Sequence, residues 1–286
     1  MTNKRHPRAR RSFIFTPGLR PDMFPKAIAS GADMVCVELE DGIAPHDKAE
    51  ARQLAMGIFA QHEVPQHVEA ILRINSLREI FGLDDVRAIL DTQTPPPAIM
   101  LPKVQSPEEV SILERWLDER GHPTRIHVII ETNMGLQAVN EIAQSSSRLE
   151  ALFFGGVDMA AELGCDLAFG PLLYARSRVV HAAATAGLDV IDVPFLDLQD
   201  PEGMREAAIS ARELGFSGKG AIHPKQIPIL NEVYTPTAER IAHARRIIDA
   251  FESANTGLVV VDGKLIEKPV LREMHRILAI ADRVGL

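Results

Sequence analysis

Acidic side chains that could bind a metal follow several short apolar runs of the sequence. Glu131 comes directly after the run Ile126–Ile130, and Asp158 follows Ala151–Phe154 with two glycines between them. Carboxylates that are brought together repel and raise each other's pKa values unless a cation neutralises them. Mg²⁺ suits such a group, because it prefers oxygen ligands, whereas softer metals need His or Cys clusters, which are not arranged here. We expect Glu131 and Asp158 to bind Mg²⁺, with Mn²⁺ as an alternative; Asp158 could equally be a first-turn acid of a helix over Met159–Leu163.

Basic side chains also stand at the ends of apolar runs, where they could receive an anionic substrate. Arg73 has the planar fork that binds a carboxylate through two hydrogen bonds, which Lys lacks. A salt bridge from Arg73 to Glu40 or Asp41 is the alternative, and both arrangements could hold together. Lys103 could contact the same substrate or form an ion pair at a barrel mouth.

Glycines and histidines near the ends of these runs are open to two interpretations. The pair Gly155-Gly156 allows a ligand to approach the backbone closely, and a tight turn is the other explanation. His46 and His223 could be general bases, but we expect them to be ordinary loop residues.

The elements that would position these side chains alternate along the chain. Short runs rich in Val, Ile and Phe predict buried parallel strands, and amphipathic segments between them predict helices. Helix starts are expected at Ser106-Pro107-Glu108 and Asp200-Pro201-Glu202, and helix ends at Gly121, Gly187 and Gly215. The eight predicted strands are Ser12–Phe15, Met34–Leu39, Glu69–Ile74, Ala98–Pro102, Ile126–Ile130, Ala151–Phe154, Val190–Val193 and Lys219–Ile222.

This alternation predicts an α/β fold, a (β/α)8 TIM barrel. An open doubly wound sheet is the second choice, but the turn Thr16–Arg20 lacks the GxGxxG fingerprint of that fold. In a barrel the active site lies at the carboxyl ends of the strands, which is where the polar residues named above fall.

The last part of the chain exceeds one barrel helix. A long helix is expected from about Pro236 to Glu252, then a β-hairpin within Gly257–Pro269 that turns at Asp262-Gly263, then a helix over Val270–Val284. We therefore divide the chain into a catalytic barrel domain, residues 1–232, and a C-terminal lid or oligomerisation extension, residues 233–286.

Composition narrows the class of protein. The net charge of −8 over 286 residues argues against nucleic acid as a partner. A basic cluster near the N-terminus could be an arm for anionic ligands, but we interpret it as a solvated tail. It comprises Lys4, Arg5, Arg8, Arg10 and Arg11.

Two further patterns concern the compartment. Cys36 and Cys165 each sit in an apolar run, so buried free thiols are expected instead of a disulfide. The chain has no apolar run long enough to span a membrane and no secretory signal at its start, so we expect a cytoplasmic enzyme without a membrane partner.

A set of motifs along nearly the whole chain carries a family resemblance. The segments are Arg11–Gly18, Gly31–Gly42, Lys48–Arg52, Leu72–Asn75, Leu101–Val104, Ile130–Thr132, Phe154–Asp158, Tyr174–Ala184, Ile191–Asp197 and Gly218–Ile227. In these segments the chain resembles the citrate lyase beta subunit and malyl-CoA lyase group of metal-dependent aldolase-type barrels. The resemblance implies metal ligation by Glu131 and Asp158, catalytic roles for Arg73, Glu40 and Asp41, and substrate contacts from Arg73, Gly156 and Val157. We add Lys103 to the expected substrate-binding residues because of its charge and its place at a strand end.

The resemblance also implies the reaction. Members of the group cleave or form a carbon–carbon bond in a 3-hydroxyacyl thioester, and the keto acid is glyoxylate, pyruvate or oxaloacetate. We therefore expect a Mg²⁺-dependent lyase acting on a malyl-CoA or citramalyl-CoA type thioester, with acetyl-CoA or propionyl-CoA as the other product. A malyl-CoA-type thioesterase, a citrate lyase beta-like subunit acting on a carrier-protein thioester, an aldolase on free acids and a non-enzymatic ligand-binding barrel are the alternatives.

The expected lid differs from the pattern of the group at one position. In the lyase branch a neighbouring subunit contributes an acid/base Asp in a motif like G-[KR]-M-[IV]-D-x-P. Here the matching stretch Gly263–Pro269 reads GKLIEKP, so Glu267 stands at that position with one more methylene. The resemblance thus implies a catalytic role for Glu267 and a homotrimer or homohexamer in which it acts.

Overall fold

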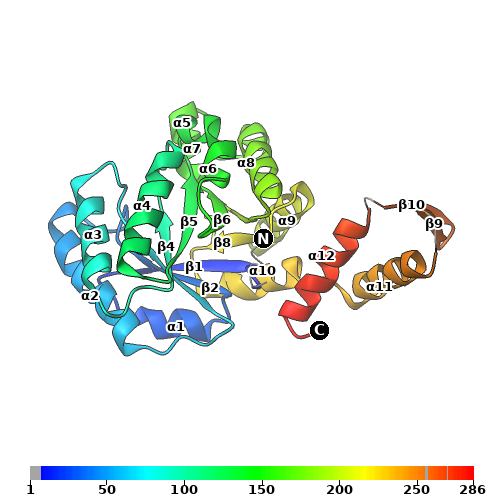
Figure 1. Ribbon diagram of the computed structural model, residues 1–286, viewed down its shortest axis with the longest axis horizontal. Coiled ribbons are helices and arrows are strands. Elements are labelled where there is room, and N and C mark those ends of the chain that lie inside the picture. The colour runs from blue at the N-terminus through cyan, green and yellow to red at the C-terminus, as the bar shows by residue number, and fades with distance from the viewer. Residues whose placement is uncertain (1–7, 255–256, 269) are drawn as a thin grey trace. The chain divides into compact units, whose positions relative to one another are not determined.

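The computed structural model describes residues 8–254, 257–268 and 270–286. Its eight parallel strands β1 to β8 close into a barrel in sequence order, because β8 pairs with β1 (Figure 1). The strands are β1 (Ser12–Pro17), β2 (Met34–Glu38), β3 (Glu69–Arg73), β4 (Ala98–Leu101), β5 (Arg125–Ile130), β6 (Leu149–Phe154), β7 (Asp189–Asp192) and β8 (Gly218–Ala221). Each coincides with one of the predicted runs to within a few residues, so the predicted (β/α)8 barrel is confirmed.

Helices connect the strands and surround the barrel (Figure 1). The predicted starts at Pro107 and Pro201 are confirmed, and Asp200 caps the second by accepting a hydrogen bond from the Gly203 N–H at 2.8 Å. The helical elements are α1 (Met23–Ala29), η1 (Pro45–Asp47), α2 (Lys48–Gln61), α3 (Ile80–Asp91), α4 (Pro107–Arg120), α5 (Asn133–Gln137), α6 (Val139–Ala143), α7 (Gly156–Leu163), α8 (Leu173–Ala186), α9 (Pro201–Leu214), η2 (Pro224–Gln226) and α10 (Ile227–Tyr234). No helix in the described ranges is long and apolar enough to cross a membrane.

Apolar side chains fill the interior of the barrel. Phe13, Cys36, Met100 and Phe153 belong to one buried cluster, in which the rings of Phe13 and Phe153 meet edge to face at 5.0 Å. Both cysteines are free thiols, as expected, but Cys165 is only partly buried. Close packing of this cluster holds the strands in fixed register, so that the side chains at their carboxyl ends have fixed positions.

The amino end of the barrel is closed by buried ion pairs, which corrects the interpretation of the N-terminal basic cluster. Arg10 is 5% exposed and pairs with Glu69 at 2.6 Å, with Asp189 at 2.8 Å and with Glu150. The solvated-tail prediction is therefore wrong for this residue. Burial lowers the pKa of Arg10, but the three carboxylates outweigh it and the net shift is upward.

The other members of the basic cluster have different surroundings. Arg11 pairs with Asp33 at 2.9 Å, so the tail interpretation is wrong there too. The backbone carbonyl of Arg8 accepts a hydrogen bond from Arg283 at 2.6 Å. Lys4 and Arg5 lie outside the described residues.

The described residues form two compact units, residues 10–231 and residues 8–9 with 232–286. The second contains α11 (Ala238–Ser253), the antiparallel hairpin of β9 (Leu258–Val261) and β10 (Lys264–Glu267), and α12 (Val270–Arg283), which confirms the predicted order. The hairpin turns at Asp262 and Gly263, whose φ angles of 50° and 74° fit a two-residue turn of this kind. The domain limits at residues 232 and 233 remain a prediction.

Candidate active site

A cavity of about 170 Å³ opens at the carboxyl ends of the strands. This is where a TIM barrel places its chemistry. Three predicted site residues with ionisable side chains, Arg73, Glu131 and Asp158, face it together with Val157. The rest of the lining is Phe13, Phe15, Met100, Ile129, Phe153, Phe154, Gly155, Asp192, Val193, Pro194 and Leu196.

Glu131 follows β5 directly and is 3% exposed. Its Oε1 accepts a hydrogen bond from the Lys103 backbone N–H at 2.8 Å. Burial, and then the negative charges of Glu40 and Asp158, raise the pKa of Glu131 from 4.5 to about 8. At neutral pH the carboxyl group is therefore largely protonated unless a cation joins it.

Gly155 has no side chain, and the carboxylate of Glu131 occupies the space where one would lie. A Cβ atom at Gly155 would lie 2.3 Å from Oε2 of Glu131, so any larger residue would displace the acid. The Gly155 N–H also donates to the Ile130 carbonyl at 3.0 Å, which fixes the turn out of β6. The group that approaches the backbone of Gly155 closely is thus the side chain of Glu131.

Asp158 lies in the first turn of α7 and is partly exposed. The helix has Gly155 as its N-cap and no side-chain cap, so Asp158 does not close the helix end. Within the described part of the chain, nothing donates a hydrogen bond or forms an ion pair to its carboxylate. The Asp158 carboxylate therefore faces the cavity without a protein partner in the described residues. It is close enough to Glu131 to raise the pKa of Glu131.

Arg73 ends β3 and reaches two carboxylates, one at the end of the neighbouring strand β2 and one in the loop that follows it. Its Nε donates to Glu38, and its Nη1 lies 3.2 Å from Oε2 of Glu40. The guanidinium also lies over the ring of Phe15, 4.4 Å from the centroid. Burial lowers the pKa of Arg73, but Glu38 and Glu40 outweigh it and raise the pKa overall, so the cation is fixed in place. The ion pair with Glu40 is present, as the salt-bridge alternative predicted, and Arg73 lines the cavity at the same time.

Lys103 joins the two acids that follow β2. Its Nζ lies 2.7 Å from Oε1 of Glu40 and 2.9 Å from Oδ1 of Asp41, so the predicted mouth ion pair is confirmed. Its φ of 53° is left-handed, a conformation that costs a non-glycine residue free energy and is found mainly where function requires it. This backbone turn directs the N–H to Glu131 while the side chain pairs with Glu40 and Asp41.

Glu40 and Asp41 differ in environment. The Glu40 side chain is 5% exposed, and burial raises its pKa, an effect that Arg73 and Lys103 offset only in part. The side chain of Asp41 is 57% exposed. Neither acid belongs to the cavity lining, and nor do Lys103 and Gly156. Glu40, Asp41 and Lys103 form a layer of ion pairs behind Arg73. Gly156 instead begins α7.

Sequence reasoning missed a buried cluster on the opposite wall. Asp192, which lines the cavity, accepts hydrogen bonds from Arg176 at 2.9 Å and from Lys219 at 2.5 Å. Burial lowers the pKa of Lys219 despite its pairing with Asp192. Asp192 was visible inside the seventh run, Val190–Val193, but α8 and β8 supply its partners from distant positions. Lys48, also missed, donates to the backbone carbonyls of Leu39 and Glu40 at 2.8 and 2.6 Å and so holds the loop that carries Glu40 and Asp41.

Three other predicted residues lie elsewhere. His46 is exposed on η1, and neither it nor His223 belongs to the mouth lining. Glu267 ends β10 in the C-terminal unit, where it is exposed and pairs in register with Leu258. A search of the described residues for three or more His, Cys, Asp or Glu side chains placed to hold a metal finds none.

Comparison with known proteins agrees with this geometry. Residues 11–224 match the family model described as HpcH/HpaI aldolase/citrate lyase. The chain is 30% identical to citrate lyase subunit beta of Escherichia coli strain K12, over 99% of this chain and 97% of that protein. It is 34% identical to L-malyl-CoA/beta-methylmalyl-CoA lyase of Rhodobacter capsulatus, over 96% of this chain and 95% of that enzyme.

A solved structure gives the same result. The CitE protein of Mycobacterium tuberculosis, in complex with magnesium, acetoacetate and coenzyme A, superposes with a TM-score of 0.78 and 30% identity, covering 95% of this chain and 97% of that one. The chain therefore belongs to the HpcH/HpaI aldolase/citrate lyase family and is a lyase of that family, which confirms the resemblance.

Proposed function

We propose that this member of the HpcH/HpaI aldolase/citrate lyase family cleaves or forms a carbon–carbon bond in a 3-hydroxyacyl-CoA thioester of malyl-CoA or citramalyl-CoA type. The products of cleavage are acetyl-CoA or propionyl-CoA and glyoxylate, pyruvate or oxaloacetate. The observation that carries this proposal is that Glu131, Asp158 and Arg73 face one cavity, with the pKa of Glu131 raised to about 8. The similarity to a malyl-CoA lyase and to a complex with magnesium and coenzyme A supports the substrate class.

The residues present fit a divalent cation. Glu131 and Asp158 would hold Mg²⁺, or Mn²⁺, because a cation between them offsets both the burial and the repulsion that raise the pKa of Glu131. Two protein carboxylates are enough for Mg²⁺, which commonly takes water and substrate oxygens as its remaining ligands. When bound, the ion supplies Lewis-acid stabilisation of negative charge on the oxygen that becomes the keto oxygen.

Arg73 would hold the substrate carboxylate. Its Nε and Nη1 already engage Glu38 and Glu40, and Nη2 has no partner among the residues that the structure describes. That donor, with the Phe15 ring fixing the plane of the guanidinium, suits an anionic group in the cavity. Arg73 thus orients the keto-acid half of the substrate.

The layer behind Arg73 would serve the same site. Glu40 and Asp41 are acids that could order water on the cavity side, with Lys103 setting their positions through its two ion pairs. The backbone of Gly156 and Val157 begins α7 beside the cavity, and its N–H groups could bind substrate oxygens. Lys103, Gly156 and Val157 are therefore proposed as substrate-binding residues.

Glu267 is the proposed proton-transfer group, acting from a neighbouring subunit of a homotrimer or homohexamer. In cleavage a base must take the hydroxyl proton, and the carbon–carbon bond then breaks to leave an enolate of the thioester. Glu267 shares one face of the hairpin with Leu258, Val260 and Leu265, whose side chains are 51%, 67% and 60% exposed. An exposed apolar face of this kind, carrying one carboxylate, suits a lid that closes over another copy's cavity.

The test is product formation by the purified full-length protein. Malyl-CoA and citramalyl-CoA are supplied with Mg²⁺, and keto acid and free thiol are measured separately. We expect keto acid to appear without free thiol, and Glu131→Gln to abolish it. Free thiol without keto acid would support the thioesterase alternative and contradict the proposal. Activity on a carrier-protein thioester alone would instead support the alternative of a citrate lyase beta-like subunit.

A further inference from the structure

Three buried charged side chains meet at the end of β7, beside the cavity. Arg176, Asp192 and Lys219 are 5%, 3% and 2% exposed, and of the three only Asp192 belongs to the cavity lining. One oxygen of Asp192 accepts from Nε of Arg176 at 2.9 Å, and the other accepts from Nζ of Lys219 at 2.5 Å. Because both oxygens are paired with cations, we do not assign Asp192 as a third metal ligand. Its ion pairs instead hold the side chain of Arg176 in place.

The guanidinium of Arg176 lies over two aromatic rings. Its Cζ atom is 5.0 Å from the ring centroid of Phe154 and 5.1 Å from that of Phe169, which is the range of a cation–π contact. Nη1 is buried and makes no hydrogen bond within the described ranges. The two rings and the hydrogen bond from Nε to Asp192 therefore orient the group, and Arg176 in turn restrains the ring of Phe154.

The ring of Phe154 supports the start of α7. A Cβ atom at Gly156 would lie 3.0 Å from Cε1 of Phe154 and 3.0 Å from Cγ1 of Val193, closer than packed carbon atoms normally approach. The backbone of Gly156 therefore packs tightly against both side chains. Gly156 is the first residue of α7, and Asp158 lies in the first turn of this helix. A shift of the Phe154 ring would thus move the turn that carries Asp158.

Asp158 depends on this backbone for its position. Its carboxylate has no hydrogen-bond or ion-pair partner in the part of the chain that the structure describes, whereas Glu131 accepts from the Lys103 N–H at 2.8 Å. The direction of the Asp158 side chain is therefore set by the helix backbone. Displacements of about 1 Å can cost a catalytic site a hundred-fold in rate, so the support of α7 matters to the chemistry.

We propose that Arg176 is a positioning residue for the proposed metal ligand Asp158. Asp192 and Lys219 hold its guanidinium, and the guanidinium fixes the ring of Phe154. The ring then sets where α7 begins, and so where the Asp158 carboxylate stands in the cavity. The inference rests on the part of the proposed function that makes Asp158 a ligand, and it assigns no contact between Arg176 and the ion or the substrate.

The test is Mn²⁺ binding to the full-length protein, measured by electron paramagnetic resonance without substrate. Arg176→Met removes the guanidinium and keeps a long side chain. Arg176→Lys keeps the charge beside Asp192 but loses the planar group that lies over the rings. We expect each variant to raise the Kd for Mn²⁺ about ten-fold or more, as loss of an outer partner of a metal ligand does. Arg176→Lys is the variant to measure if Arg176→Met does not fold.

Combination with Asp158→Asn tests the route of the effect. If Arg176 acts through Asp158, adding Arg176→Met to Asp158→Asn should change the Kd less than about two-fold, because changes along one route are not additive. A general structural role would instead weaken binding equally in both backgrounds. Phe154→Leu should weaken Mn²⁺ binding as Arg176→Met does, since it removes the ring through which Arg176 acts.

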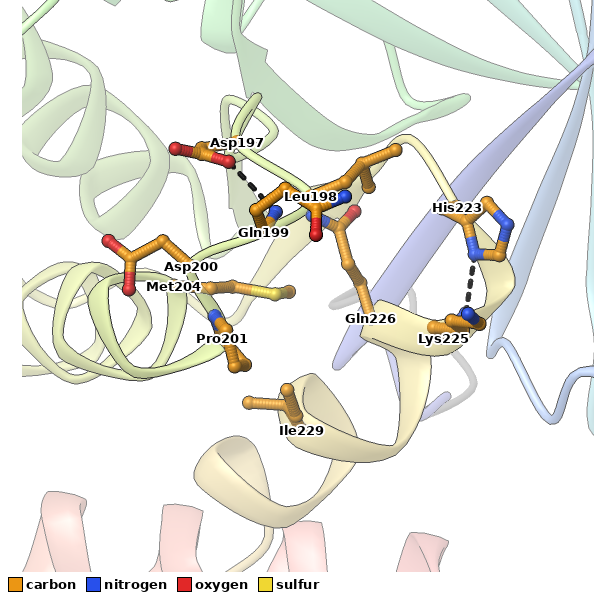
Figure 2. A pocket seen from close by; sticks show the side chains of 10 residues that line it. All are labelled: Asp197, Leu198, Gln199, Asp200, Pro201, Met204, His223, Lys225, Gln226 and Ile229. Atoms are coloured by element: carbon orange, nitrogen blue, oxygen red, sulfur yellow. Dashed lines mark hydrogen bonds between the residues drawn. The ribbon is translucent and has the colours of Figure 1, made fainter.

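Two controls separate positioning from a general loss of stability. Arg10→Met removes an arginine that is equally buried, at 5% exposed, but pairs with carboxylates at the amino end of the barrel. Leu198→Ala changes a side chain on the loop after β7 that lines a different cavity (Figure 2). Both controls should keep the wild-type Kd for Mn²⁺ to within about two-fold.

Wild-type affinity for Mn²⁺ in the folded Arg176 variants would overturn the inference. So would a loss in Arg176→Met that persists in full on top of Asp158→Asn, or an equal loss in Arg10→Met. The proposed function is judged separately, by whether the wild type releases keto acid. A wild type that binds Mn²⁺ but releases none would contradict the proposed function, and the Kd values alone would still decide the role of Arg176.

Discussion

At the residue scale, the mouth gathers acids that repel one another around Glu131. Burial, and then the charges of Glu40 and Asp158, raise its pKa, while the Lys103 N–H and the charge of Arg73 lower it without compensating. The ionised form of Glu131 is therefore unfavourable without a cation and favourable with one, so a proton and a metal ion compete for its carboxylate.

This competition predicts how metal affinity changes with pH. Below the Glu131 pKa of about 8, the ion must displace a proton, so the affinity for Mg²⁺ should rise with pH by up to about ten-fold per unit and level off above 8. Titrations of the apo protein with Mg²⁺ between pH 6 and 9 measure it. An affinity independent of pH over this range would show that Glu131 is not a ligand.

The same group predicts a pH effect on folding in the absence of metal. The folded-state pKa of Glu131 lies above the unfolded value of 4.5, so the stability of the metal-free protein should fall as pH rises from about 4.5 to 8. In Glu131→Gln that component should disappear, and the variant should be more stable than the wild type at pH 9 in chelator. Thermal unfolding at pH 5 and pH 9 compares the two, and equal pH dependence would contradict the assignment.

Gly155 offers a test of how closely this acid is placed. In Gly155→Ala the new Cβ would meet Oε2 of Glu131 at 2.3 Å, so the carboxylate must move by about 1 Å and activity should fall about 100-fold or more. Gly57→Ala is the control, because its Cβ would lie 3.6 Å from Gln61 in the middle of α2 and should stabilise the protein by up to about 1 kcal/mol. Steady-state rates and unfolding midpoints distinguish them. Full activity in Gly155→Ala would show that the position of Glu131 is not critical.

At the element scale, the sequence was informative because strand and helix signals were strong. Runs such as Met34–Val37 are apolar throughout, as barrel strands are, and Pro107 and Gly121 mark the ends of α4. What could not be predicted were pairings between elements. Nothing local links Arg10 to Glu69, or Asp192 to Lys219, because register and strand tilt decide which side chains meet.

The Arg10 cluster predicts a change in stability without a change in chemistry. Arg10→Met would leave Glu69, Glu150 and Asp189 without their shared cation at the amino end of the barrel, opposite the mouth. The free energy of unfolding should fall by about 3–5 kcal/mol, as it does when one partner of a buried ion pair is removed. Chemical denaturation measures this, with Arg87→Met as the exposed control. A loss below about 1 kcal/mol would contradict the structural role.

At the scale of the whole molecule, the residues of the candidate site belong to two different units of the chain. Glu131, Asp158 and Arg73 converge within residues 10–231, as their positions at the carboxyl ends of β5, β6 and β3 predicted. Glu267 belongs to the other unit, and its role was implied by resemblance only. Sequence cannot place it, because the position of a lid depends on assembly.

Mixed oligomers test whether Glu267 acts across subunits. Glu267→Ala and Glu131→Gln should each be inactive, but co-expressed chains should recover about a quarter of wild-type activity, since random mixing gives that share of sites an intact cavity and an intact lid. Separately purified and then combined proteins, if they do not exchange subunits, serve as the control. No recovery in verified mixed oligomers would show that Glu267 does not complete a neighbour's site.

The central claim is that Glu131 and Asp158 together hold the divalent ion, and Mn²⁺ binding tests it most directly. Electron paramagnetic resonance titrations at pH 8, with pyruvate present, compare the wild type with Glu131→Gln and Asp158→Asn, and circular dichroism verifies that each variant is folded. The account predicts one tightly bound Mn²⁺ per wild-type chain and a loss of at least about ten-fold in affinity in each variant. Wild-type affinity in either folded variant would contradict it.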